Sequence, residues 1–185
     1  MNQVILLSGP PGAGKTLVGE ALCERFDRMV HVEVDELRHW VKAGYRHPWV
    51  GDRQAAEQLE LAGRSAVAVA REAINMRYSV VITDVALPQK AELYRDLLYR
   101  LPVPAHIVTL LPSLEVTLAR DAESRVSFPE RIEPLHRLFT DAVAEGTLPG
   151  VVLDTSTDSG PQQTADRVQD LVGRGLSLVR ASNWN

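Results

Sequence analysis

The chain has 185 residues, of which 45% are hydrophobic, a formal net charge of −4 and a pI near 5.7. This length and apolar content suit one α/β domain with a single core. Because Lys and Arg are scattered along the chain rather than clustered, we expect neither nucleic acid nor an anionic membrane as a partner.

Short apolar runs alternate with longer segments of helical period, which is the pattern of a parallel sheet covered by helices. The predicted strands span residues 3–7, 29–34, 79–83, 105–110 and 151–153. The predicted helices span residues 15–26, 52–77, 88–100, 113–125, 133–145 and 161–172. The clearest is 52–77, where alanines recur three or four residues apart and predict a flat face that packs on the sheet.

Two of the predicted strands differ in their hydrophobic pattern. Val80, Val81 and Ile82 form a continuous apolar run, as in a strand that is buried on both faces. Residues 30–34 instead alternate between apolar and polar side chains, as in a strand with one wetter face. We therefore expect the 29–34 strand at an edge of the sheet.

The ends of the chain carry no targeting signal that we can identify. Residues 1–7 lack a basic leader, and no apolar run reaches the ~18 residues that a membrane span needs. The one cysteine, Cys23, cannot form an intrachain disulfide and reads as a buried helical residue. We expect a cytoplasmic protein with one domain over residues 1–175 and a tail, docked or disordered, over 176–185.

The strongest motif is a phosphate-binding loop between the first strand and the first helix. Its residues are Gly9, Pro10, Pro11, Gly12, Ala13, Gly14, Lys15 and Thr16. The glycines allow the backbone amides to form an anion-binding nest, Lys15 points a charge at the β and γ phosphates, and Thr16 can bind Mg²⁺. A turn that binds nothing would leave Lys15 at a helix start, where the helix dipole disfavours a cation. The motif therefore predicts ATP and Mg²⁺ as cofactors.

Other parts of the sequence narrow the class of phosphate-loop protein. The second half contains no N-K-x-D tetrapeptide for reading guanine, which argues against a Ras-like GTPase. The buried strand 80–83 ends at Asp84, but Val85 follows where many ATPases place a water-activating Glu. Hydrolysis is therefore not the expected main reaction.

Two aspartates follow predicted strands at the edge of the sheet where open α/β folds bind ligands. Asp84 can hold Mg²⁺ directly or through water, or it can cap a helix in the turn. Asp35 can accept or orient an acceptor hydroxyl, or it can be the N-cap of the helix that follows. The residues alone leave both pairs of alternatives open.

With these motifs, the chain resembles the small P-loop kinases of the shikimate and gluconate kinase group, and chloramphenicol phosphotransferase most closely. The specific blocks are the phosphate loop and residues 32–37, 80–85 and 118–125. The resemblance implies a P-loop NTPase fold, with a five-stranded parallel sheet of order 2-3-1-4-5, helices on both faces and a small lid. It also implies that Asp35 is the catalytic base.

The same resemblance suggests a lid at about residues 120–132 that closes over ATP, with Arg120 and Arg125 as catalytic and nucleotide-binding candidates. On one helix these two arginines would lie about 140° apart, so both reach the nucleotide only if the helix ends before Arg125. Arg131 is a substitute for either, and the alternative is solvated arginines. By the same analogy, residues 154–158 form the loop that contacts adenine.

The segment 39–49 departs from that group. It carries Trp40 and Trp49, two of the three tryptophans, and its aromatic and basic side chains suggest an acceptor pocket for a ring-bearing substrate. The alternative is that both tryptophans cover the core beneath a long connection. The residues expected to bind the acceptor are Asp35, Arg38, Trp40, Trp49 and Asp84.

These observations favour a kinase that transfers the γ-phosphoryl group of ATP to a hydroxyl of a small molecule, such as an antibiotic or a sugar-like compound. Two alternatives remain: a kinase of nucleotides or nucleotide sugars similar to the zeta toxins, and a regulatory module that binds ATP without turnover. The oligomeric state is not predicted.

Overall fold

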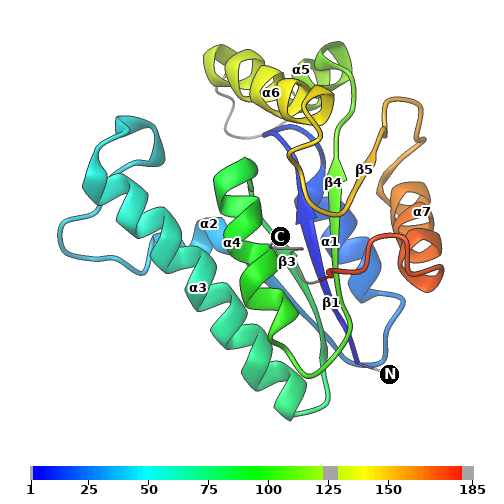
Figure 1. The fold of residues 1–185 in the computed structure, drawn as a ribbon. Helices are drawn as coiled ribbons and strands as arrows, with labels where there is room; N and C mark the ends of the chain where they lie inside the picture. The colour runs from blue at the N-terminus through cyan, green and yellow to red at the C-terminus, as the bar shows by residue number, and fades with distance from the viewer. Residues whose placement is uncertain (1, 123–128, 181–185) are drawn as a thin grey trace.

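The computed structural model of the protein describes residues 2–122 and 129–180. Five strands form one parallel sheet in the order β2-β3-β1-β4-β5 (Figure 1). They are β1 (Val4–Ser8), β2 (Met29–Glu33), β3 (Ser79–Thr83), β4 (Ala105–Leu110) and β5 (Val151–Leu153). The predicted sheet order is confirmed, and β2 lies at the edge as its alternating sequence indicated.

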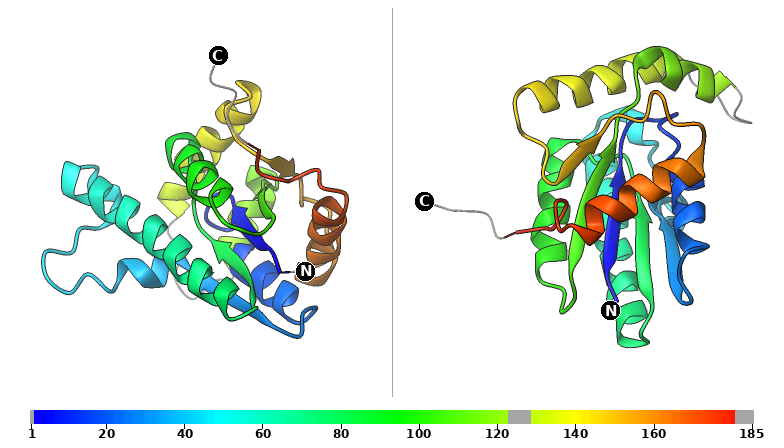
Figure 2. Two further views of the ribbon diagram at one scale, coloured as in Figure 1. Left: turned by 60° about the horizontal axis from the view of Figure 1, so that its bottom comes forward. Right: turned by 90° about the vertical axis from the view of Figure 1, so that its right-hand side faces the viewer.

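Helices cover both faces of the sheet and its carboxyl end. They are α1 (Lys15–Cys23), α2 (Val34–Arg38), the 3₁₀ turn η1 (Pro48–Val50), α3 (Arg53–Asn75), α4 (Pro88–Tyr99), α5 (Leu114–Ala122), α6 (Pro129–Ala144) and α7 (Pro161–Gly173). Helices α1 and α7 pack on one face and α3 and α4 on the other, whereas α5 and α6 lie beyond the strand ends (Figures 1 and 2). Within the described ranges, no helix has the length and apolar character needed to cross a membrane.

Side chains on the two faces of the sheet form two separate apolar clusters. Leu6 and Ile82 pack toward α3 and α4, where the predicted alanine face of α3 is buried. Ile5 and Val81 pack toward α1 and α7. Because β1 and β3 are buried on both faces, the burial holds their carboxyl ends, and the loops that follow them, in fixed positions.

Two of the described helix bounds differ from those predicted by three residues or more. Helix α1 ends at Cys23 rather than at 26, and α6 begins at Pro129, four residues before 133. The second difference arises because Pro129 occupies the first helical turn, where proline fits, while Pro134 lies inside the helix. The last three residues of the predicted 113–125 helix fall outside the described residues.

The beginning of the C-terminal tail is docked on the sheet. The Ile107 amide donates to the Ser177 carbonyl oxygen at 3.0 Å, and the Val179 amide donates to the Ala105 oxygen at 2.8 Å. Buried His106 and Ser177 also share a 3.0 Å side-chain hydrogen bond. The tail thus pairs with the first half of β4, which the short strand β5 does not reach.

Candidate functional site

The phosphate loop leaves the carboxyl end of β1 and enters α1 through positions that only glycine can occupy. Gly9 has φ of 141°, and a Cβ there would lie 2.2 Å from the Leu110 carbonyl oxygen. Gly12 has φ of 78°, and a Cβ there would lie 2.6 Å from the Thr117 oxygen. These glycines let the loop pass against the end of β4 and the start of α5.

The first turn of α1 is open to an anion. Its N-cap is Gly14, in the left-handed conformation at φ of 86°, and the first turn contains no acidic residue. The side chains therefore leave the helix N-terminal amides and the positive end of the dipole available, which is the arrangement that binds phosphate.

Lys15 folds back over the loop. Its Nζ donates hydrogen bonds to the Gly9 carbonyl oxygen at 3.0 Å and to the Pro10 oxygen at 2.9 Å. Burial lowers the pKa of Lys15 from 10.5 to about 8, although the charges of Asp35 and Asp84 act to raise it. An incoming phosphate would add a negative charge beside this ammonium, whose two hydrogen-bond partners are neutral carbonyl oxygens.

A cavity of about 530 Å³ joins the phosphate loop to Asp35, Arg120 and the first turn of α7. The loop contributes Lys15 and Thr16, and α7 contributes Pro161 and Thr164. The structure thus brings together the predicted phosphate-binding residues, the candidate base and one of the candidate lid arginines.

Asp35 is not the N-cap of α2. The helix begins at Val34 with Glu33 as its N-cap, which makes Asp35 the second helical residue. The side chain of Asp35 is 63% exposed, and its Oδ1 lies 2.5 Å from Nη2 of Arg38, one turn along the helix. The capping alternative is therefore wrong for this residue. The carboxylate is exposed at the cavity, where it can contact a ligand.

Glu33 is a candidate functional residue that the sequence reasoning missed. The Thr16 hydroxyl donates a 2.8 Å hydrogen bond to Glu33 Oε2. A hydroxyl beside a carboxylate is the oxygen donor set that Mg²⁺ prefers, so these residues fit the metal. In the described ranges, no group of three or more His, Cys, Asp or Glu side chains could hold a metal ion. The one sequence signal is that Glu33 ends β2 two residues before Asp35.

Asp84, the other predicted Mg²⁺ ligand, is 2% exposed and already has three partners. Its Oδ1 accepts from the Val85 amide at 2.8 Å, and its Oδ2 accepts from the Tyr94 hydroxyl at 2.6 Å. Lys90 Nζ lies 2.6 Å from the same Oδ2. Burial, followed by the Asp84 charge, raises the pKa of Tyr94 well above its usual value. Because α4 begins at Pro88 with Leu87 as its N-cap, Asp84 does not cap that helix either.

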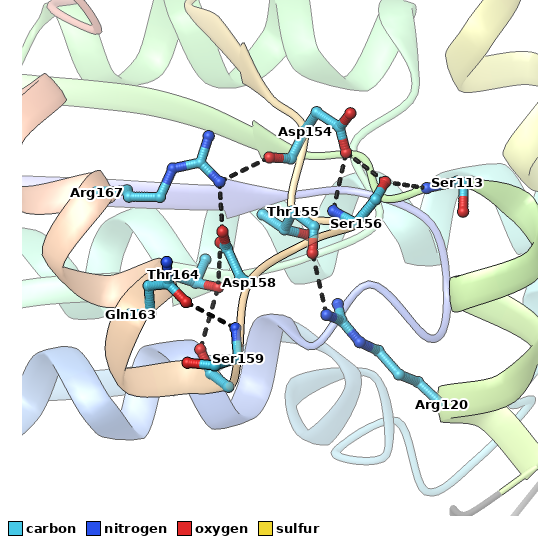
Figure 3. Close-up of polar contacts among 11 residues, drawn as sticks. Ser113, Arg120, Asp154, Thr155, Ser156, Asp158, Ser159, Gln163, Thr164 and Arg167 are labelled. Carbon is cyan, nitrogen blue, oxygen red and sulfur yellow. Dashed lines mark hydrogen bonds and ion pairs between the residues drawn. The ribbon is translucent and has the colours of Figure 1, made fainter.

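Hydrogen bonds and an ion pair cross-link the loop between β5 and α7, next to the cavity. Arg120 Nη2 donates to the Thr155 carbonyl oxygen at 3.1 Å, which ties α5 to this loop (Figure 3). Asp158 pairs with Arg167 at 2.5 Å, and Asp154 accepts from the Ser156 amide at 2.9 Å (Figure 3). These contacts hold the predicted adenine-contacting segment in place.

Only part of the predicted lid belongs to the described residues. Arg120 lies at the cavity, and the nearest atom to a Cβ built on Gly14 is Arg120 Nη1, at 3.9 Å. Arg125 and the middle of the proposed lid, residues 123–128, lie outside the described residues. Arg131, the proposed substitute, instead has its Cζ 3.7 Å from the centre of the Trp49 ring.

The two tryptophans do not cover the core. Trp40 is 66% exposed and Trp49 52% exposed. The Trp49 ring stacks on His47 with centroids 4.3 Å apart, and Tyr45 meets His47 edge-on at 5.1 Å. The core-covering alternative is therefore wrong, and the segment carries an exposed row of rings.

Comparisons with known proteins agree with the fold. A family model described as an AAA domain matches residues 4–133. No curated protein matches the chain. The resemblance to small P-loop kinases is confirmed at the level of the fold by the solved structures that follow.

Three solved structures are similar over nearly the whole chain. The tunicamycin resistance protein of Deinococcus radiodurans is 21% identical with a TM-score of 0.64, and the match covers 98% of this chain and 100% of that one. Shikimate kinase from Bacteroides thetaiotaomicron is 16% identical with a TM-score of 0.66, covering 92% and 98%. The APS kinase of Mycobacterium tuberculosis, in complex with AMPPNP and APS, is 18% identical with a TM-score of 0.61, covering 93% and 98%.

Proposed function

We propose, from the premise that the chain belongs to the AAA-domain family, that it is an ATP-dependent kinase of a small molecule with a hydroxyl group. The observation that carries this proposal is the single cavity that contains both the phosphate loop and Asp35. Phosphoryl transfer needs a bound nucleotide and an oriented acceptor side by side, and one cavity supplies places for both.

The loop holds the triphosphate. The amides at the start of α1 bind the phosphate oxygens, and Lys15 places its charge on the β and γ phosphates. Thr16 would hold Mg²⁺ together with a carboxylate, either Glu33, which Thr16 contacts, or Asp84 through water. When bound, the metal neutralises charge on the phosphates.

Asp35 acts on the acceptor. Its carboxylate accepts the hydroxyl proton as the acceptor oxygen bonds to the γ-phosphorus. The bond from that phosphorus to the β–γ bridging oxygen breaks, so the products are ADP and a phosphate ester. Arg38, 2.5 Å from Asp35, holds the carboxylate in its orientation. Arg120, at the cavity, adds positive charge beside the developing charge on the phosphates.

The acceptor enters beside the aromatic row. Trp40, 66% exposed, offers a surface on which a ring can stack, and Trp49 adds a second aromatic ring, 52% exposed, in the same segment, which supports a ring-bearing acceptor. The names of the similar structures, a tunicamycin resistance protein and a shikimate kinase, support a small-molecule acceptor such as an antibiotic or a sugar-like compound. We also propose a cytoplasmic location, because ATP is available there.

Purified protein is incubated with Mg²⁺, ATP and a panel of hydroxyl compounds that includes antibiotics, sugars, nucleosides and ring-bearing hydroxy acids, while ADP is followed. The proposal expects ADP formation that depends on one acceptor class and is absent in the Lys15→Ala variant. Turnover only with nucleosides or nucleotide sugars would favour the zeta-toxin-like alternative. Tight ATP binding without any acceptor-dependent ADP would favour the regulatory module.

A further inference from the structure

We propose that the ion pair of Asp158 with Arg167 is a positioning element for the nucleoside half of the nucleotide, because it holds the turn of α7 that borders the cavity. This inference rests on the proposed function only for the presence of a nucleotide at the phosphate loop. It concerns two residues that take no part in the proposed phosphoryl transfer. Neither of them lines the cavity, so each acts through the wall that it supports.

The lining of the cavity indicates where the nucleoside half lies. The phosphate loop and the first turn of α1 form one part of the lining, with Asp35 beside them. The rest of the lining comes from α5 and from the start of α7, and its residues are Arg120, Asp121, Gly160, Pro161 and Thr164. When the triphosphate occupies the loop amides, the ribose and the base are left the space between α5 and α7.

Asp158, two residues before the N-cap of α7, is bound to that helix through both carboxylate oxygens. Its Oδ1 lies 2.5 Å from Nη1 of Arg167, and its Oδ2 accepts a 2.8 Å hydrogen bond from the Thr164 hydroxyl (Figure 3). The side chain of Asp158 is only 2% exposed, so solvent screens this ion pair weakly. Because Thr164 belongs to the cavity lining, the Asp158 carboxylate holds a residue of the wall directly.

Arg167 fastens both ends of the loop that leads into α7. The same Nη1 that pairs with Asp158 donates a 2.8 Å hydrogen bond to the carbonyl oxygen of Asp154, the first residue after β5. The N-cap of α7 is Gly160, and no side chain caps this helix by a hydrogen bond. The ion pair therefore holds the first turn of α7 in place of a capping side chain.

The same loop is tied to the opposite wall of the cavity. Arg120 of α5 donates to the Thr155 carbonyl oxygen at 3.1 Å. The amide of Ser113, just before α5, donates to Ser156 Oγ at 2.8 Å (Figure 3). The loop thus joins α5 to α7, and its shape sets the space between these two walls. The phosphate loop follows the fully buried strand β1 instead, so a shift of the loop 154–158 would affect the nucleoside half more than the phosphates.

The test compares a complete nucleotide with its phosphate part alone. Calorimetry measures the Kd of AMPPNP with Mg²⁺, and displacement of AMPPNP measures the Kd of inorganic tripolyphosphate. In Asp158→Asn the Kd of AMPPNP should rise by roughly tenfold, because the charge-assisted contact with Arg167 is lost. The Kd of tripolyphosphate should stay within about twofold of the parent value. In turnover, the KM for ATP should rise while kcat at saturating ATP is kept, as expected for a loss of uniform binding.

Two further variants control the test. The side chain of Arg167 is 38% exposed, so water can solvate it in Asp158→Asn, and we expect this variant to fold. The double variant Asp158→Asn with Arg167→Gln replaces the pair by two neutral amides and should show the same selective loss of AMPPNP binding. Arg174→Gln breaks an exposed ion pair with Asp170 at the end of the same helix and should change neither Kd. Chemical denaturation verifies that each variant is folded.

The outcomes separate the positioning pair from the proposed kinase. An unchanged Kd of AMPPNP in the two Asp158 variants overturns the positioning role, even if their free energy of unfolding falls. Equal rises in the Kd of AMPPNP and of tripolyphosphate overturn it as well. A selective loss of AMPPNP binding without any acceptor-dependent ADP supports the positioning pair and contradicts the kinase. If tripolyphosphate does not displace AMPPNP from the parent protein, the phosphate-loop assignment on which both proposals rest is wrong.

Discussion

The Thr16 hydroxyl, at the start of α1, donates a 2.8 Å hydrogen bond to the Glu33 carboxylate at the end of β2. The two residues are 17 positions apart in the chain. They meet because α1 starts at the end of β1 and packs across β3 and against β2, and all three parallel strands end at the same edge of the sheet. This contact puts a carboxylate beside the hydroxyl that the phosphate-loop motif assigns to Mg²⁺.

Glu33→Gln should weaken the use of Mg²⁺. The amide keeps the size of the side chain and can still contact Thr16, but it loses the negative charge that a divalent cation needs. The Mg²⁺ concentration for half-maximal rate should rise by roughly 10- to 100-fold, which is the usual effect of losing a supporting group at a metal site. The measurement is the initial rate against free Mg²⁺ at saturating ATP.

Asp84→Asn is the matched control for that change. Because Asp84 is buried and paired with Lys90, its loss should lower the free energy of unfolding by about 3–5 kcal/mol, as expected when one partner of a buried ion pair is removed. Chemical denaturation measures this. A large shift in Mg²⁺ dependence in Asp84→Asn, with none in Glu33→Gln, would make Asp84 the metal-side carboxylate instead.

ATP binding should take up a proton at alkaline pH. Lys15 has a pKa of about 8 in the free protein, so roughly half of its side chains are neutral at pH 8, and bound phosphate favours the charged form. Calorimetry in two buffers of different ionisation enthalpy should show an uptake of up to about half a proton at pH 8 and little at pH 6. Lys15→Met should abolish the uptake, and exposed Lys42→Met should keep it.

The same pKa has a consequence for stability. Because the folded value of about 8 lies below the ordinary value of 10.5, the unfolded chain binds more protons between these pH values. The contribution of Lys15 to stability is therefore unfavourable below pH 8, and this penalty disappears as the pH rises toward 10.5. Lys15→Met should be more stable than the parent at pH 7, with a difference that shrinks above pH 8. An unchanged difference across this range would contradict the buried ammonium.

Much of the fold follows from the sequence because the signals are local and strong. The continuous apolar run of β3 and the alternating pattern of β2 predicted which strand is central and which is at the edge. Helix ends were harder, since Pro134 looks like a helix start but lies within α6. The docking of Ser177 on β4 depends on β5 being only three residues long, which no local pattern reveals.

The site was predictable where a motif fixes it and not where tertiary contacts do. The spacing of the phosphate loop gave Lys15 and Thr16 directly. Glu33 was read as part of the wetter face of an edge strand, because its contact with Thr16 exists only once β2 and α1 are packed. Asp84 was read as a Mg²⁺ ligand or a helix cap, because its ion pair with Lys90 depends on how α4 packs.

Trp49→Ala should affect the acceptor more than the nucleotide. Loss of this aromatic contact should raise the KM for a ring-bearing acceptor by roughly tenfold, an effect of about 1.4 kcal/mol, and leave the KM for ATP nearly unchanged. Tyr99→Ala, which removes an exposed ring at the end of α4, is the control. Adding acceptor should also change the intrinsic fluorescence. Equal rises in both KM values would place Trp49 outside the acceptor site.

Asp35→Asn tests the proposed base. Because Asp35 is not an N-cap and its side chain is largely exposed, the change should have little effect on stability. The amide cannot accept the hydroxyl proton, so kcat should fall by roughly 10²- to 10⁴-fold, while ATP affinity is retained. Glu36→Gln alters the neighbouring exposed carboxylate of the same helix and should be nearly silent. A near-normal kcat in Asp35→Asn would remove this residue from the mechanism.

The most direct test of phosphoryl transfer is to identify where the γ-phosphate goes. Phosphorus NMR of a reaction with the best acceptor of the panel, recorded for the parent protein and for Lys15→Ala, separates a phosphate ester from inorganic phosphate. The account predicts one ester resonance that grows in step with ADP, coupled to the carbon-bound protons beside the phosphorylated oxygen, and no such resonance with Lys15→Ala. Growth of inorganic phosphate alone, at the same rate with and without acceptor, would contradict it.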